Sequence, residues 1–284
     1  MPAKRITDYP SRTPTYTQPT ISVVTCVRNG VAGIARTIES VTAQGIADLE
    51  YIIVDGASTD GTQDVIRSYS DKITFWQSEP DEGISDGLNK GIALTTGRYI
   101  ALIHSDDWLA PGQLERSVHT LGTSGADFVF GDLLMHDRFG PSHILRGDRE
   151  YIRRIEHIMP TLNHPTVVVR REAYEVHGLF DTDYQLAMDY ELLLRFYRAG
   201  LRGVYDSSIM GHMSLEGISD RNTLAALAEV RRASTQHSYP PHLANFRFGY
   251  RVFKNLVHRT LRHVAPATTR HLRRFVNPSY KFLE

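Results

Sequence analysis

The sequence predicts an α/β fold with a mostly parallel sheet covered by helices on both faces. Three observations lead to this prediction. Short β-branched apolar runs alternate with segments of helical periodicity, the connections between them are short, and 284 residues suffice for one large α/β domain with an appendage. The apolar fraction of 41% is compatible with a buried core.

The expected elements follow one another in a regular order. Strands are expected at 21–27, 51–54, 73–77, 99–103 and 127–130, and helices at 34–43, 63–69, 84–94 and from about 111. Further along, a strand is expected at 167–170, then a segment at 171–177 and a helix at 189–199. From about residue 220 the chain is expected to be all-helical.

Acidic and polar residues follow the predicted strands. They are Arg28 and Asn29, Asp55, the run at 79–81, Asp106 with Asp107, and Asp132. Because the carboxyl ends of parallel strands meet at one edge of a sheet, these residues should gather there. The sequence therefore predicts a polar site at that edge.

Asp106 and Asp107 come directly after the apolar run at 99–103. One interpretation is a cap for the next helix, since Asp is a common capping residue and Pro111 lies downstream. A single Asp suffices for capping, however, and two carboxylates also suit a hard divalent cation. Asp55, at the end of a neighbouring strand, strengthens the second interpretation.

Two Gly-rich segments lack the common nucleotide-binding fingerprints. The loop D-G-A-S-T-D-G-T at 55–62 has no Lys after Gly61, so it is no Walker loop, and the crossover V-R-N-G-V-A-G at 27–33 has no G-x-G-x-x-G. Any tight turn favours such residues. Asp55 is nevertheless suited to accept hydrogen bonds from a base or ribose.

The segment E-P-D-E-G-I-S-D-G-L-N-K-G at 79–91 places Asp86, Asn89 and Lys90 on one helical turn. This is either a polar helix start or a surface that contacts a nucleotide.

Together these segments resemble the family 2 glycosyltransferases, which have the Rossmann-like GT-A fold of nucleotide-diphospho-sugar transferases. The matching stretches are S-V-V-T-C-V-R-N, Y-I-I-V-D-G-A-S-T-D-G-T, G-I-S-D-G-L-N-K-G-I-A-L-T-T-G-R-Y-I, H-S-D-D-W, and G-L-F-D followed by A-M-D-Y-E-L-L-L-R. They cover about residues 20–220 in the family's order and spacing. The bacterial polysaccharide and O-antigen members are the most similar.

The resemblance implies a catalytic domain with a nucleotide-sugar half at about 20–135 and an acceptor half at about 136–220. A flexible arm at 1–19 would precede it, and a basic helical region at 221–284 would follow. Asp106, with Asp107 beside it, would bind the Mn²⁺ or Mg²⁺ that bridges the diphosphate. The residues expected to bind the nucleotide-sugar are Thr25, Val27, Asn29, Asp55, Asp86, Asn89, Lys90, Ser105 and Asp106.

Asp189 matches the family's acidic general base, which takes the proton of the acceptor hydroxyl. Without the resemblance it would be explained as an acid favoured by the dipole of a helix N-terminus. Two positions depart from the family pattern, because His104 replaces the first acid of D-x-D and Met188 stands where many members carry Glu. The acceptor-side candidates are His164, Met188 and Asp189.

His164 and His212 are second-rank candidates, since a lone His is usually structural. Both resemble family positions near the acceptor or the diphosphate. His212 is a candidate third metal ligand beside Asp106 and Asp107.

The net charge of zero is unevenly distributed, at about −10 for residues 1–229 and +10 for residues 230–284. Segment 246–264 interleaves apolar residues with Arg and Lys at helical spacing. It is either a helix docked on the domain or, with the rest of 246–274, an interfacial helix on an anionic membrane. These helices could also serve a homodimer, whereas no motif supports nucleic-acid binding.

We therefore expect a metal-dependent, inverting glycosyltransferase that moves a sugar from a nucleotide-diphospho-sugar to a saccharide acceptor, lipid-linked in form, in bacterial surface-polysaccharide synthesis. The single cysteine, Cys26, is expected to pack at the end of the first strand. One cysteine and the lack of an apolar leader or spanning segment together predict a cytoplasmic protein, with a peripheral place on the inner membrane as one option. The rival hypotheses are a nucleotidyltransferase and a non-catalytic homologue that binds a nucleotide-sugar or a membrane.

Overall fold

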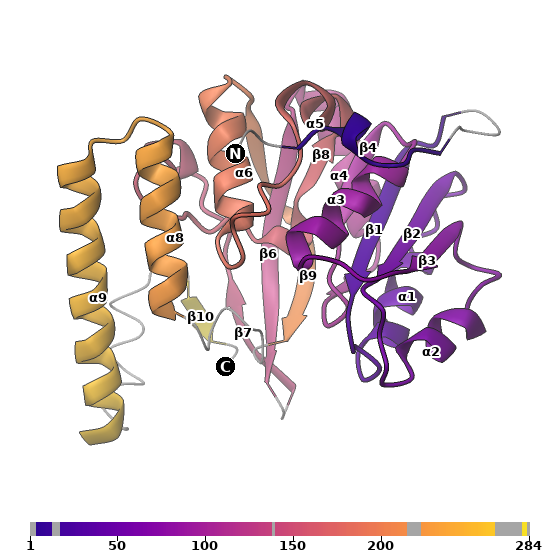
Figure 1. Ribbon diagram of the computed structural model, residues 1–284, viewed down its shortest axis with the longest axis horizontal. Helices are drawn as coiled ribbons and strands as arrows, with labels where there is room; N and C mark the ends of the chain where they lie inside the picture. Colours follow the sequence, from indigo (N-terminus) through magenta and orange to yellow (C-terminus); the bar gives the residue numbers. More distant parts are fainter. Residues whose placement is uncertain (1–3, 13–17, 138–139, 215–222, 265–279, 283–284) are drawn as a thin grey trace.

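The computed structural model describes residues 4–12, 18–137, 140–214, 223–264 and 280–282, which form a curled mixed sheet flanked by helices (Figure 1). The sheet order is β10-β7-β6-β8-β4-β1-β2-β3. The strands are β1 (Ile21–Val27), β2 (Leu49–Asp55), β3 (Phe75–Ser78), β4 (Tyr99–Leu102), β5 (Trp108–Leu109), β6 (Phe128–Asp137), β7 (Gly140–Leu145), β8 (Val168–Arg170), β9 (Gly203–Ser214) and β10 (Tyr280–Phe282).

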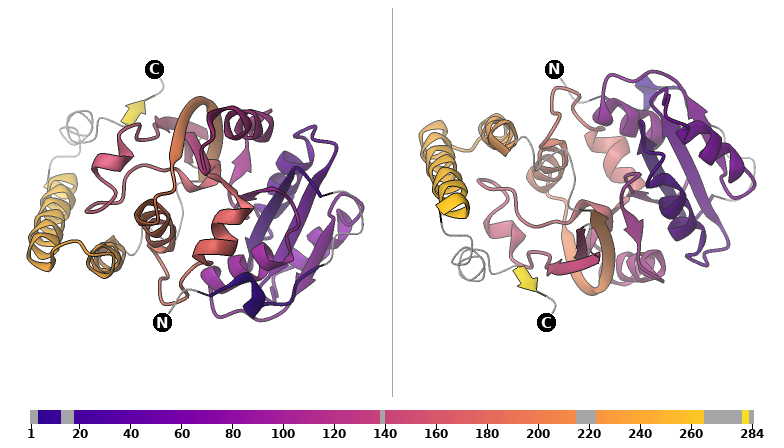
Figure 2. Two further views of the ribbon diagram at one scale, coloured as in Figure 1. Left: turned by 90° about the horizontal axis from the view of Figure 1, so that it is seen from above. Right: turned by 90° about the horizontal axis from the view of Figure 1, so that it is seen from below.

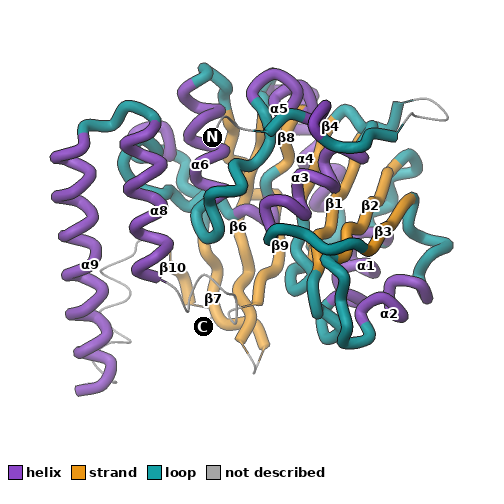
Figure 3. Tube along the Cα trace, in the orientation of Figure 1, coloured by secondary structure: helices purple, strands orange, loops and turns teal. Residues whose placement is uncertain are grey.

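The helices are α1 (Ile34–Thr42), α2 (Thr62–Ser68), α3 (Ile84–Leu94), α4 (Gln113–Ser124), α5 (Arg171–His177), α6 (Met188–Arg198), α8 (Thr223–Gln236) and α9 (Pro241–Val264). Their alternation with the strands is visible along the tube in Figure 3. The predicted strand at 21–27 and the predicted helix at 84–94 have the observed bounds. The other predicted strands and helices through α6 are shifted by a few residues, except that β6 is much longer than predicted.

The sheet is parallel only in part. Strands β3, β2, β1 and β4 are mutually parallel, as the alternation of elements predicts. The inserted β8 is antiparallel to both β4 and β6, and β7 is antiparallel to β6, while β9 is parallel to β6. The predicted α/β fold is thus confirmed, with a sheet that is parallel in the first half of the chain and mixed in the second.

Two sequence predictions about single elements are also corrected. Strand β6 runs on to Asp137, so Asp132 lies within it and not at its end. Its carboxylate is buried and accepts hydrogen bonds from the Gly147 N–H (2.9 Å) and the Tyr205 hydroxyl (2.7 Å). The region after 220 is not all-helical, because β10 pairs with β7.

The alternation of side chains along the central strands creates two cores, one on each face of the sheet. Val24, Ile52 and Val54 face the core shared with α3, α5, α6 and α8. Val23 and Ile53 face the core shared with α1, α2 and α4. Cys26 is buried in the first of these cores, as predicted for the end of β1. Viewed from above and below, α8 and α9 lie side by side at the end of the molecule away from β1, β2 and β3 (Figure 2).

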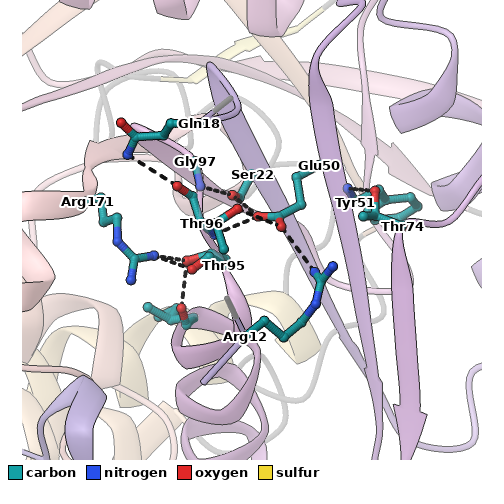
Figure 4. A network of polar contacts seen from close by, with 11 residues as sticks. Arg12, Gln18, Ser22, Glu50, Tyr51, Thr74, Thr95, Thr96, Gly97 and Arg171 are labelled. Carbon is teal, nitrogen blue, oxygen red and sulfur yellow. Dashed lines mark hydrogen bonds and ion pairs between the residues drawn. The ribbon is translucent and has the colours of Figure 1, made fainter. Parts of the chain in front are cut away.

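At the amino ends of the strands, a buried carboxylate links several segments (Figure 4). Glu50 of β2 accepts hydrogen bonds from the Ser22 hydroxyl (2.5 Å) and from the N–H (2.7 Å) and hydroxyl (2.9 Å) of Thr96. Arg12 reaches the same carboxylate at 3.1 Å. This network is structural and lies at the opposite ends of the strands from the predicted site.

The described part of the N-terminal arm is held against the domain and does not project freely. Besides the contact of Arg12, the Lys4 carbonyl accepts the Leu179 N–H at 2.7 Å, and Tyr9 packs on the core. The expected flexibility of residues 1–19 is therefore not seen at 4–12, while 1–3 and 13–17 lie outside the described residues.

Candidate active site

Three ionisable side chains from separate parts of the chain meet near the carboxyl end of β4. His104 follows β4, His164 begins a 3-10 turn (His164–Thr166), and Asp189 lies in the first turn of α6. The two imidazole rings stack with centroids 4.9 Å apart, and Nε2 of His164 lies 3.3 Å from Oδ1 of Asp189. His104, identified in the sequence only as a departure from D-x-D, is thus a member of this cluster.

Three buried atoms of the cluster form no hydrogen bond, although one of them, Oδ1 of Asp189, lies 3.3 Å from Nε2 of His164. The other two are Nδ1 of His104 and Nδ1 of His164. The side chains of Asp189 and His164 are only 21% and 14% exposed, respectively. The cavity beside them is otherwise lined by Leu102, Val167, Val169, Tyr174, Phe180, Leu192 and Leu193. Because buried polar atoms are normally paired, these unpaired atoms indicate a place for a polar ligand group.

Burial sets the protonation of the cluster. It raises the pKa of Asp189 to about 6, against a smaller opposing effect of His104. It also lowers the pKa of His164 to about 4 and, with a further contribution from His164, that of His104 to about 4. At neutral pH both rings are therefore uncharged while the carboxylate is ionised, as a proton acceptor must be.

Asp106 and Asp107 lie in different environments. Asp106 is exposed, whereas Asp107 is 3% exposed and accepts the N–H of Ser214 at the end of β9. Burial, with the adjacent charge of Asp106, raises the pKa of Asp107 to about 8. The expectation of two open carboxylates side by side is therefore wrong, and Asp106 is the accessible one.

His212 on β9 lies opposite Trp108, in a stack of side chains. Its ring is parallel to that of Trp108, with centroids 5.0 Å apart, and Arg36 covers Trp108 at 3.6 Å while contacting the Asp106 carbonyl. Nδ1 of His212 is 2.9 Å from Nε2 of His136, which leaves Nε2 of His212 outside this bond. No group of three or more His, Cys, Asp or Glu side chains suited to a metal occurs among the described residues.

The loop that carries Ser105 and Asp106 is shaped by the start of α1. Thr37 donates its hydroxyl to the Ser105 carbonyl (2.9 Å) and to the Asp107 carbonyl (2.7 Å). A Cβ atom at Gly33 would lie 2.4 Å from the Ser105 carbonyl oxygen, so only glycine allows this approach.

The predicted donor residues of β1 and β2 divide into two groups. Asp55 is fully buried, and its Oδ2 accepts the Ser58 N–H (3.0 Å) and the Ser78 hydroxyl (2.6 Å), whereas its Oδ1 has no partner. Asn29 adopts a left-handed conformation (φ 53°), and its N–H bonds the Ser58 hydroxyl at 2.7 Å. These two residues therefore share Ser58 at the ends of adjacent strands.

Thr25 and Val27 belong to the framework of the sheet. The Thr25 hydroxyl bonds the Tyr51 hydroxyl at 3.0 Å inside the core, and the Val27 carbonyl accepts the Gly56 N–H at 2.8 Å. Both side chains are buried, which contradicts direct side-chain contact with a donor in this conformation.

Asp86 and Lys90 form an ion pair (3.3 Å) on α3, and Lys90 also pairs with Glu79 (3.0 Å). Burial acts to lower the pKa of Lys90, but its two acidic partners raise it overall. Tyr9 of the N-terminal arm donates its hydroxyl to Asp86 at 3.2 Å. The sequence contains no signal for this contact, which joins residues 77 positions apart.

Asn89 and Met188 are structural residues, which corrects their predicted roles. Asn89 is fully buried, and its side-chain amide exchanges two hydrogen bonds of 2.9 Å with the backbone of Phe180. Met188 is 6% exposed, and its sulfur accepts the Ser85 hydroxyl at 3.1 Å. Both side chains join α3 to the acceptor half and do not face an open pocket.

A residue that sequence reasoning missed caps α6. The carboxylate of Glu229 on α8 accepts the N–H groups of Gln185 (3.2 Å), Leu186 (2.8 Å) and Ala187 (2.8 Å). Ala187, at the N-cap position, offers no side-chain cap of its own. The helix that carries Asp189 is therefore capped from the C-terminal region, about forty residues away in sequence.

The family model described as glycosyl transferase family 2 matches residues 22–178. A relative from Mycobacterium tuberculosis, named uncharacterized glycosyltransferase Rv1514c, is 30% identical over 229 residues, covering 78% of this chain and 86% of the relative. The putative glycosyltransferase EpsE of Bacillus subtilis is 31% identical over 204 residues, covering 65% and 69%.

Two solved structures share the fold at low identity. Staphylococcus aureus TarS 1–349, also solved with UDP and with UDP-GlcNAc, has a TM-score of 0.58 at 16% identity, covering 79% of this chain and 68% of TarS. The mannosyltransferase PcManGT of Pyrobaculum calidifontis, solved with GDP-Man and Mn²⁺, has a TM-score of 0.59 at 18% identity, covering 93% and 78%. The motif order, the mixed α/β sheet with its polar rim, and these matches together establish that the chain belongs to glycosyl transferase family 2 and has the GT-A fold.

Proposed function

We propose that the protein transfers a sugar from a nucleotide-diphospho-sugar to a saccharide acceptor with inversion at the anomeric carbon. The observation that carries this proposal is the position of Asp189 beside a polar strand rim, where its largely buried carboxylate has an Oδ1 that accepts no hydrogen bond and lies 3.3 Å from Nε2 of His164. A single carboxylate that deprotonates the acceptor hydroxyl is the catalytic group that an inverting displacement needs.

In this mechanism Asp189 accepts the proton of the acceptor hydroxyl while the hydroxyl oxygen attacks the anomeric carbon. The bond between the anomeric carbon and the diphosphate breaks in the same step. His164 is uncharged and contacts the same carboxylate, so it orients Asp189 without neutralising it. On the donor side, the unpaired oxygen of Asp55 is a hydrogen-bond acceptor for the base or ribose. Access to it requires a rearrangement of the surrounding loop, because Asp55 is fully buried.

The accessible residues near Asp106 fit a divalent cation only in part. Such an ion takes one or two carboxylates and completes its shell with substrate phosphates and water, so exposed Asp106 would be the carboxylate ligand for Mn²⁺ or Mg²⁺, and His212 stays a candidate second ligand. The ion would supply charge stabilisation of the leaving diphosphate. Asp107 is excluded from this shell by its burial and its bond to Ser214.

We extend the proposal to a lipid-linked acceptor in bacterial surface-polysaccharide synthesis. Its support is the relatives' naming, which includes glycosyltransferases of PGL/p-HBAD biosynthesis in Mycobacterium bovis. No helix among the described residues is long and apolar enough to cross a membrane.

The test is a panel of UDP-, GDP- and dTDP-sugars, each with Mn²⁺ and with EDTA. Thermal shift reports donor binding, and release of nucleoside diphosphate reports turnover. Asp189→Asn should keep the donor-induced shift and lose turnover by a factor of about 10² to 10⁴, whereas the exposed Asp71→Asn should behave as wild type. Normal turnover by Asp189→Asn would refute the base assignment. Release of pyrophosphate from a nucleoside triphosphate would indicate nucleotidyl transfer instead.

A further inference from the structure

The outermost helix, α9, presents its apolar residues to solvent. Leu243, Phe246, Tyr250 and Phe253 are 42%, 75%, 61% and 65% exposed. Their spacing of three, four and three residues places them on one stripe of the helix, which we call the outer stripe. Figures 1 and 2 show α9 at the edge of the molecule, with α8 between it and the rest.

The inner side of the same helix packs on α8 through Ala244, which is 5% exposed, and Phe248, whose ring centre lies 5.6 Å from the Arg231 guanidinium, and polar residues flank this side. Arg251 is partly buried, and burial lowers its pKa, with Arg247 acting in the same direction. Arg247 donates to the Tyr239 hydroxyl at 2.9 Å, and Arg231 of α8 bonds Asn245 at 2.7 Å. Helix α9 is therefore apolar on its outer side as well as against α8, whereas a helix that only packs on a domain normally has a polar outer face. The packing of α9 on α8 therefore leaves the outer stripe without an occupant in the described structure.

Charge decides which occupant fits. From 230 to 283 the chain contains eleven Lys or Arg and no Asp or Glu. Arg247 and Lys254 follow the stripe residues and lie about 60–80° round the helix from its centre. A second copy would bring two basic helices together, which is unfavourable, whereas an anionic surface would be attracted to the same charges.

From this arrangement we infer that the outer stripe of α9 is a peripheral membrane anchor, which inserts into the interface of an anionic bilayer with its flanking cations at the level of the head groups. The predicted contribution of residues 265–274 lies outside the described residues. The inference goes beyond sugar transfer, and its test needs no substrate, so its failure would leave the proposed transfer standing.

The test is flotation of the full chain with phosphatidylcholine vesicles and with vesicles that contain 30% phosphatidylglycerol. Wild type should float with the anionic vesicles alone, and added salt should weaken binding. Phe246→Ser with Phe253→Ser should lower the partition coefficient at least about tenfold, because two aromatic side chains leave the bilayer. Lys254→Glu should lower it by more than about fivefold.

The matched control is Val176→Ser on α5, which removes a side chain that is 64% exposed outside the outer stripe. It should bind as wild type, and all variants should keep the wild-type thermal midpoint because the altered positions are exposed. Equal binding of the double variant and wild type, or no binding to either vesicle, would overturn the inference. So would a wild-type dimer in light scattering that the double variant converts to monomer, since the occupant would then be a second copy.

Discussion

Replacing Asp189 by Asn should stabilise the protein at neutral pH while it abolishes transfer. The pKa of Asp189 is raised from an ordinary 3.8 to about 6 by burial. Each unit corresponds to about 1.4 kcal/mol, so ionised Asp189 costs the folded state about 3 kcal/mol. Asn keeps the shape of the side chain and carries no charge.

The sign of the pH dependence follows from proton binding. Between about pH 4 and 6 the carboxyl of Asp189 has lost its proton in the unfolded chain and retains it in the folded protein. Its contribution to the free energy of unfolding therefore falls as pH rises through this range, and that contribution is constant above about pH 6. The free energy of unfolding of Asp189→Asn minus that of wild type should therefore be near zero at pH 4 and grow to about 2–3 kcal/mol at pH 7.5. Other titrating groups cancel in this difference.

The measurement is urea unfolding of wild type, Asp189→Asn and the exposed control Asp71→Asn at intervals between pH 4 and 8. The control should show no such trend. In wild type, kcat/KM should rise with pH through about 6 as the base ionises. A difference that stays flat across this range, or an Asn variant less stable than wild type at pH 7.5, would show that Asp189 is not held in a desolvated site.

Three further predictions concern other parts of the molecule. Asp106→Ala should remove the Mn²⁺-dependent part of the donor-induced thermal shift. Without donor it should change the free energy of unfolding by no more than about 0.5 kcal/mol, since the side chain is exposed. An unchanged effect of Mn²⁺ would place the ion elsewhere. Glu229→Ala should lower the free energy of unfolding in urea by about 1–2 kcal/mol and reduce kcat more than it raises KM, because α6 loses its cap. Glu229→Gln should retain most of the stability and most of kcat. Losses in the Gln variant as large as those in the Ala variant would contradict a role of the acceptor oxygens of Glu229. Glu50→Ala should lower the free energy of unfolding by about 3 kcal/mol, because Ser22 and Thr96 lose their buried hydrogen-bond partner. A decrease of less than about 1 kcal/mol in calorimetry would show that the network is dispensable.

Local sequence pattern was sufficient for the first half of the fold. The β-branched runs of β1 and β2 and the apolar periodicity of α1 and α3 are local signals, and short connections between parallel strands leave few alternative topologies. The residues at the strand ends could therefore be assigned to one rim from the order of elements alone, and Asp55 and Asp106 follow their strands as expected.

The second half of the fold depends on non-local pairing. The insertion of β8 between β4 and β6, the extension of β6 through Asp132, and the addition of β10 to β7 are set by partners far away in sequence. A strand's direction and length depend on the edge that it meets, which periodicity does not encode. The sequence therefore predicted β8 without its place in the sheet, predicted β6 as too short and did not predict β10.

For the site, the sequence by itself determined which chemistry is present, through Asp55, Asp106 and Asp189 in motifs of known order. Only the tertiary structure decided their protonation and availability. Asp107 differs from Asp106 by its burial and its bond to Ser214, His104 and His164 are uncharged because both are desolvated, and the cap of α6 comes from Glu229 on another helix. Burial and long-range contact depend on what packs against a side chain, and a residue's immediate neighbours in sequence do not specify that.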